Sequence, residues 1–99
     1  MSKSNLELTY ELAMQQYIHS STGVAVASVI LNMYDSSSFN INTMGLLNIA
    51  DNSEIETIML AFTEFLKTGE EPHHLLGAER WSSFYELYAN AVQKLAEPA

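Results

Sequence analysis

The stretch Val24-Ala25-Val26-Ala27-Ser28-Val29-Ile30-Leu31 decides the fold of this chain. It is apolar on all sides and rich in β-branched residues, so its pattern fits both a buried helix and a buried strand. No other segment has the quality of a partner strand, and a lone strand has nothing with which to pair. We therefore predict a central buried helix that ends near Tyr34.

A helix is also predicted before this stretch, from Asn5 to His19. Its main apolar stripe consists of Leu6, Tyr10, Ala13 and Tyr17. Leu8 and Leu12 lie one turn apart on a second face, so this helix either sits between two neighbours or meets another chain there. The following Ser20-Ser21-Thr22-Gly23 supplies hydroxyl groups that suit the start of the central helix, together with a glycine, and predicts a break.

Two further helical segments are predicted after the central one. A polar loop over 35–38 precedes a short helical turn that carries the apolar residues Met44, Leu46, Leu47 and Ile49. Asp51 and Glu54 have the spacing of a capping box, in which side chains bond the free backbone donors of a helix start. The predicted buried stripe of this helix is Ile55, Ile58, Met59, Phe62, Phe65 and Leu66. Lys67 and Gly69 are typical of a helix end.

The C-terminal part is predicted to hold a loop and a final amphipathic helix. Pro72 and Gly77 bound a loop or imperfect turn over 70–77. The last helix, over 78–96, has a broad apolar face made of Trp81, Phe84, Tyr85, Tyr88, Ala91, Val92 and Leu95. We expect one all-α domain over residues 1–99, a bundle of four main helices plus one short helical turn. Its stability should come mainly from burial of Phe62, Phe65, Trp81, Phe84 and Tyr88.

The charge of the chain is strongly one-sided. No Lys or Arg lies between Lys3 and Lys67, and the net charge is −8. Such a surface repels nucleic acid and anionic membranes and attracts basic proteins. The chain has no cysteine, no apolar run of spanning length and no secretory pattern in its first ten residues, so we expect a cytoplasmic protein without disulfides.

No motif predicts catalysis or a cofactor. His73 and His74 are adjacent, and neighbouring side chains on a helix point about 100° apart, so we interpret them as part of a solvated loop and expect no metal. The hydroxyl groups near His19 and in the 36–38 run lack the base and third group that a nucleophile needs. We therefore expect that the protein is not an enzyme.

The acidic-capped helix supplies the candidate interface. Glu54, Glu56, Leu60 and Glu64 are its candidate partner-binding residues. Leu60 falls between Glu56 and Glu64 on the side opposite the apolar stripe, as a small site for a basic partner would present it. Leu8 and Leu12 are the candidate residues for self-association.

The order of these segments resembles a small bacterial helical domain family of unknown function, found in proteobacterial chromosomes and genomic islands. The corresponding segments are Ser21-Thr22-Gly23, 24–34, Phe39-Asn40-Ile41, 51–65, Glu71-Pro72 and 81–88. The chain departs from the family pattern at Val24, where glutamine is usual, at Met33-Tyr34, where tryptophans are usual, and at Asn40, which replaces an acid. The resemblance implies an all-helical fold and carries no activity.

Two functions fit these features. The first is a small acidic interaction protein that binds a basic surface of another protein, in the manner of phage or mobile-element inhibitors of the anti-CRISPR or DNA-mimic type. Its partner would itself bind nucleic acid, while this chain would bind neither nucleic acid nor membrane. The second is a self-associating helical adaptor, in which Leu8, Leu12 and Leu60 bury one another across a two-fold axis.

Overall fold

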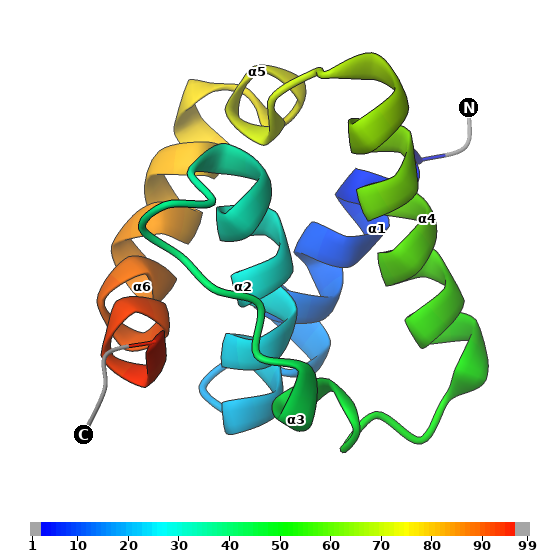
Figure 1. Cartoon of the computed structure of the whole chain (residues 1–99), viewed down its shortest axis with the longest axis vertical. Helices are drawn as coiled ribbons and strands as arrows, with labels where there is room; N and C mark the ends of the chain where they lie inside the picture. The colour runs from blue at the N-terminus through cyan, green and yellow to red at the C-terminus, as the bar shows by residue number, and fades with distance from the viewer. Residues whose placement is uncertain (1–2, 97–99) are drawn as a thin grey trace.

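The chain folds into an all-α bundle, as predicted (Figure 1). The computed structural model describes residues 3–96, and this range contains no strand. Its elements are α1 (Asn5–Glu11), the π-helical segment η1 (Leu12–Gln16), α2 (Ser21–Tyr34), α3 (Thr43–Leu46), α4 (Asn52–Thr68), α5 (Pro72–Leu76) and α6 (Ala78–Ala96). The four longer helices and the short α3 were predicted. The expected loop over 70–77 was wrong in part, because Pro72 occupies the first turn of α5, where its missing N–H does no harm.

The central helix is α2, which Figure 1 shows between α4 on one side and α6 on the other. Ser20 caps its start by accepting a hydrogen bond from the Gly23 N–H at 3.0 Å, as the sequence predicts. Its last residue is Tyr34. Residues 25–31 are all buried, so the stretch that was compatible with helix or strand is a helix surrounded by neighbours.

Helix α6 covers one side of α2 with Phe84, Tyr88 and Val92, which are at most 2% exposed. The Tyr88 hydroxyl donates to the Ala13 carbonyl, which ties α6 to the N-terminal segment. Trp81 is only half-buried. The prediction that Trp81, Phe62 and Phe65 form the buried core was therefore wrong, since all three lie at the edge of the cluster that Phe84 and Tyr88 share with α2.

The N-terminal helix differs from the continuous helix that was predicted over residues 5–19. Helix α1 starts with a capping box, in which Ser4 and Glu7 bond each other's backbone N–H groups. After Glu11 the backbone widens into η1, and the Tyr17 N–H donates to the Leu12 carbonyl at 2.9 Å. With this wider turn the side chain of Tyr17 reaches α4.

Helix α4 is the longest helix after α6, yet only Ile58 and Ala61 are buried in it. Asp51 caps its start, and Gly69, with φ of 70°, ends it in the left-handed conformation that glycine favours. The predicted buried stripe was wrong at Met59 and Leu66, which are 64% and 68% exposed. Helix α4 contacts its neighbours mainly through the side that carries Ile58 and Ala61. Its apolar residues cover a wider part of the helix surface than this contact, so Met59 and Leu66 stay outside it.

Candidate functional site

The candidate partner-binding residues divide between two sides of α4. Glu56, Leu60 and Glu64 follow one another at a spacing of four residues and are all exposed, Leu60 by 43%. We call these three residues the acidic strip. The Glu64 carboxylate accepts a hydrogen bond from the Asn5 side chain at 2.9 Å, which places this end of the strip beside α1.

Glu54 is not part of this strip. Its carboxylate is half-buried and accepts a hydrogen bond from the Tyr17 hydroxyl at 2.5 Å. This hydrogen bond raises the pKa of Tyr17 above its usual value, because it favours the protonated phenol beside a carboxylate. Glu54 therefore links α4 to the end of η1. The predicted capping role holds for Asp51, whose carboxylate accepts from the Ser53 N–H at 2.8 Å, but not for the Glu54 side chain.

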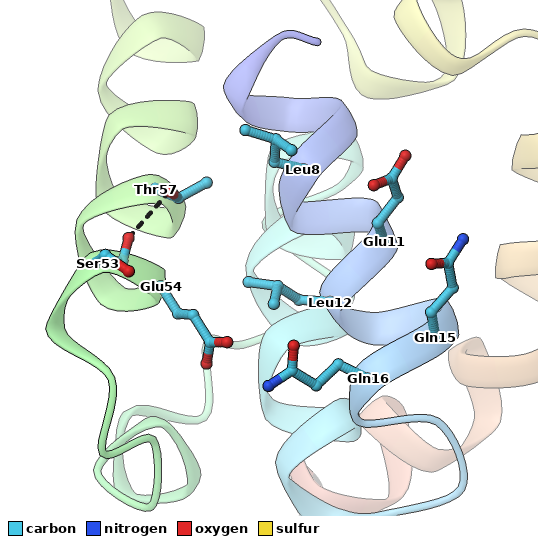
Figure 2. A pocket seen from close by; sticks show the side chains of 8 residues that line it. All are labelled: Leu8, Glu11, Leu12, Gln15, Gln16, Ser53, Glu54 and Thr57. Atoms are coloured by element: carbon cyan, nitrogen blue, oxygen red, sulfur yellow. Dashed lines mark hydrogen bonds between the residues drawn. The ribbon is translucent and has the colours of Figure 1, made fainter.

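Leu8 and Leu12 face α4 across a groove of about 260 Å³ between the two helices (Figure 2). Leu12 is half-buried and packs against the core, whereas Leu8 is 38% exposed at the groove edge. The second apolar face of the N-terminal helix thus lies beside a neighbour within the same chain. Figure 2 also shows Glu54 pointing into this groove.

A second exposed feature is apolar, with two large side chains in or next to α3 and two on α4. Met44, Leu47, Met59 and Leu66 are each between 64% and 76% exposed. Met59 also lines a groove of about 180 Å³ whose other walls include Ile41, Leu46 and Phe62. Met59 and Leu66, seven residues apart, share one side of α4, and we call these two residues the apolar face. Sequence periodicity missed it because Met59 and Leu66 have the same spacing as buried residues.

The cations near α1 are already paired. The Lys3 ammonium lies 2.5 Å from the Glu11 carboxylate, and the Arg80 guanidinium lies 3.2 Å from the Glu7 carboxylate. The Ser4 backbone N–H, followed by Arg80, lowers the pKa of Glu7. Among the side chains that the structure describes, no ion pair involves Glu56 or Glu64. The acidic strip therefore keeps its negative charge for an external group.

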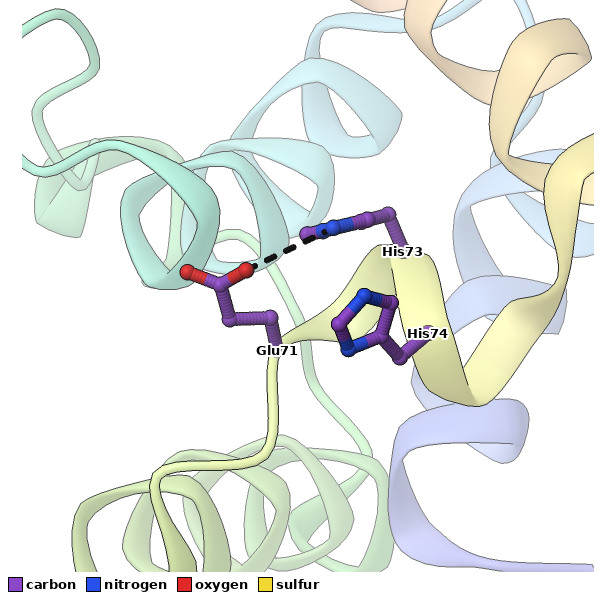
Figure 3. A group of neighbouring side chains, drawn as sticks. All are labelled: Glu71, His73 and His74. Carbon is purple, nitrogen blue, oxygen red and sulfur yellow. Dashed lines mark ion pairs between the residues drawn. The ribbon is translucent and has the colours of Figure 1, made fainter.

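The structure also brings Glu71, His73 and His74 together at the start of α5 (Figure 3). Nε2 of His73 lies 3.4 Å from a carboxylate oxygen of Glu71, and the two imidazole centroids are 4.3 Å apart. One ligand atom from each of the three residues lies within 4.8 Å of the others. The expectation that neighbouring histidines diverge was wrong here, because the rings tilt toward each other.

The hydroxyl groups singled out in the sequence serve local structure. Ser20 Oγ donates to the Tyr17 carbonyl at 2.5 Å while it caps α2. Ser37 and Ser38 donate to the Asp35 carboxylate at 2.7 and 2.8 Å, and these bonds lower the pKa of Asp35. Ser20, Ser37 and Ser38 therefore each order a turn or a helix start.

Comparisons with protein-family models, curated proteins and solved structures found no match for this chain. The resemblance to the bacterial family therefore stays a prediction. Across residues 3–96, no helix combines the length and apolar character that crossing a membrane requires.

Proposed function

We propose that this protein is a small acidic interaction protein whose α4 side binds a basic surface of another protein. The observation that carries the proposal is the composition of that side. The apolar face exposes Met59 and Leu66, and the same helix carries the acidic strip. Exposed apolar groups rimmed by polar residues are typical of protein interaction sites.

The apolar face and the acidic strip should contribute differently to binding, because their expected interaction energies differ. Burial of a large apolar side chain contributes about 1.5–3 kcal/mol, whereas an exposed ion pair contributes about 0–1 kcal/mol. Met59 and Leu66 would therefore supply most of the affinity. Glu56 and Glu64 would accelerate encounter with a cationic partner and exclude acidic ones.

An inhibitor of nucleic-acid binding is the specific form of this function that we propose. Carboxylates on a helix can replace phosphates in a basic groove, and the net charge of −8 favours such a partner over nucleic acid or an anionic membrane. DNA mimicry and many small phage inhibitors, anti-CRISPR proteins among them, rely on the same physics. The proposal places the protein in the cytoplasm and assigns it no catalytic step.

The test is capture of partners by the immobilised chain at low and high salt, with identification of what elutes. The variant carries Glu56→Lys and Glu64→Lys, and its matched control carries Glu79→Lys and Glu86→Lys on α6, where both acids are also exposed. We expect a basic partner that is retained at low salt, released at high salt and displaced by added nucleic acid. Loss with the α4 variant alone supports the proposal. Equal retention by both double variants contradicts it.

Self-association is the second candidate, favoured by the exposure of Leu8 and Leu60 near α1 and α4. A dimer would bury these two side chains across a two-fold axis. Because Leu12 packs against the core, Leu8→Glu is the suitable variant. Light scattering at high protein concentration should show a dimer that Leu8→Glu separates. A monomer at all concentrations excludes this function.

A further inference from the structure

We propose that Glu71, His73 and His74 form a binding site for a divalent transition-metal ion of the Zn²⁺ class. The site lies at the start of α5 (Figure 3), and it shares no residue with the acidic strip or the apolar face. Two imidazoles and one carboxylate are ligands that suit Zn²⁺, Ni²⁺ and Cu²⁺. In a tetrahedral Zn²⁺ site, three protein ligands leave the fourth position for water.

The distances fit such an ion. Bonds of about 2.0–2.1 Å place neighbouring ligands of a tetrahedral site about 3.3 Å apart. Nε2 of His73 and the Glu71 carboxylate oxygen are already 3.4 Å apart, so this edge is formed. The third ligand atom lies within 4.8 Å of the other two, and His74 is exposed, so a side-chain rotation can bring it closer.

The imidazole of His73 is held in place by aromatic neighbours from other helices. Its ring centroid lies 5.4 Å from that of Tyr34, in an edge-to-face arrangement, and 6.0 Å from that of Trp81. Such packing reduces the freedom that a ligand would lose on binding. Nε2 of His73 is directed at Glu71, whereas Nδ1 is buried without a hydrogen-bond partner among the described residues.

Among the described residues, the carboxylate of Glu71 is paired only with His73 of the same cluster. Glu71 is the N-cap residue of α5, but its side chain makes no capping hydrogen bond. The N-cap side chains of α1, α2, α3 and α4 all make one. Glu70 is exposed beside Glu71, and its charge adds to the local attraction for a cation.

The buried Nδ1 also limits the expected affinity. Histidine ligands usually donate their second ring N–H to a carboxylate or carbonyl, and loss of such a partner lowers metal affinity about 10–100-fold. His73 has no such acceptor among the described residues. We therefore expect saturable but exchangeable binding of one ion per chain.

The test titrates Zn²⁺ alone into the untagged full chain by calorimetry, with excess Mg²⁺ to occupy carboxylates that bind hard cations. Fluorescence quenching by Cu²⁺ gives a second signal, because Trp81, the one tryptophan of the chain, lies beside His73. His74→Asn is the decisive variant, since His74 is exposed and its replacement leaves the packing of His73 against Tyr34 and Trp81 intact. His73→Asn and Glu71→Gln complete the set, with circular dichroism to confirm that each variant is folded.

The matched control is His19→Asn. His19 is exposed and has φ of 59°, a left-handed conformation that asparagine tolerates. We expect one Zn²⁺ per chain, an affinity at least about tenfold lower in each cluster variant, and no change in His19→Asn. Absence of saturable binding, or equal affinity in His74→Asn and wild type, would overturn the proposal. The double lysine variant of α4 should keep the Zn²⁺ affinity, so failure of either proposal leaves the other distinguishable.

Discussion

Helices α2 and α4 use apolar residues in opposite ways. In α2, nine of the 14 residues are buried, and residues 25–31 are buried without a break. In α4, two of the 17 residues are buried, although Ile55, Met59, Phe62, Phe65 and Leu66 are all large and apolar. Grooves of about 180, 240 and 260 Å³ run along α4 against its neighbours. Core packing therefore explains most of the apolar residues of α2 but only part of those of α4.

The difference teaches where to look for a function in a chain without a catalytic motif. A residue such as Ile30, which is fully buried in α2, stabilises the fold, and its side chain is not accessible to a ligand. Met59 and Leu66 contribute little to the fold, so their apolar character needs another explanation. An interface that covers them in the bound state provides one.

The largest expected effect is in the core of α2. Ile30→Ala should lower the free energy of unfolding by about 2–5 kcal/mol, because it removes buried methyl groups and leaves a cavity at a position with no exposure. Urea unfolding followed by circular dichroism measures the change. A loss below about 1 kcal/mol would mean that α2 is not tightly packed, and the contrast with α4 would fail.

The second effect concerns the start of α2, where Gly23 approaches the preceding backbone. A Cβ at this position would lie 2.2 Å from the Tyr17 carbonyl oxygen and 2.8 Å from the Tyr88 hydroxyl. Gly23→Ala should therefore destabilise the protein by about 1–3 kcal/mol, more than the roughly 0.5–1 kcal/mol that alanine gains in a helix. Ser21→Ala, at an exposed position in the same turn, is the control for the thermal unfolding measurement. A Gly23→Ala variant more stable than wild type would show that position 23 has room for a Cβ beside the Tyr17 carbonyl oxygen.

The third effect tests the attachment of α4 through Tyr17 and Glu54. Tyr17→Phe should lower stability by about 1 kcal/mol, since it removes one hydrogen bond to a carboxylate. The pKa of Tyr17 is raised in the folded state, so its contribution is complete below pH 10.0 and is lost as pH rises through the folded pKa. The stability difference between wild type and variant should therefore shrink above that pH.

Unfolding at a series of pH values from neutral to alkaline measures this difference. Tyr10→Phe is the matched control, because no hydrogen bond of the Tyr10 hydroxyl is found among the described residues. A difference that stays constant at high pH would show that the hydrogen bond does not stabilise the folded state.

The smallest expected effect is on the outer side of α4. Met59→Ala should change the free energy of unfolding by less than about 0.5 kcal/mol, since the side chain is 64% exposed. The same variant should weaken binding of the proposed basic partner. Met59→Ala should therefore change binding more than stability, whereas Ile30→Ala should mainly lower stability. A stability loss comparable to that of Ile30→Ala would place Met59 in the core after all.

Local signals in the sequence predicted much of this fold. Ser20, Asp51 and Gly69 mark helix ends as expected, because caps and turns depend on residues a few positions apart. The face that α4 buries could not be predicted, since its apolar sector is wider than its contact and the choice depends on where α1 and α2 lie. Convergence of His73 with Glu71 likewise depends on ring orientations and on Tyr34, which lies far away in the sequence.

The hydrogen bond between Tyr88 and Ala13 has a consequence for how the chain folds during synthesis. It joins residues 75 positions apart, and the ion pair of Arg80 with Glu7 joins residues 73 positions apart. Until α6 leaves the ribosome, the side of α2 that packs against Phe84 and Val92 has no cover. Formation of the native core must therefore wait until α6 has been synthesised, and the nascent protein exposes its most apolar helix until then.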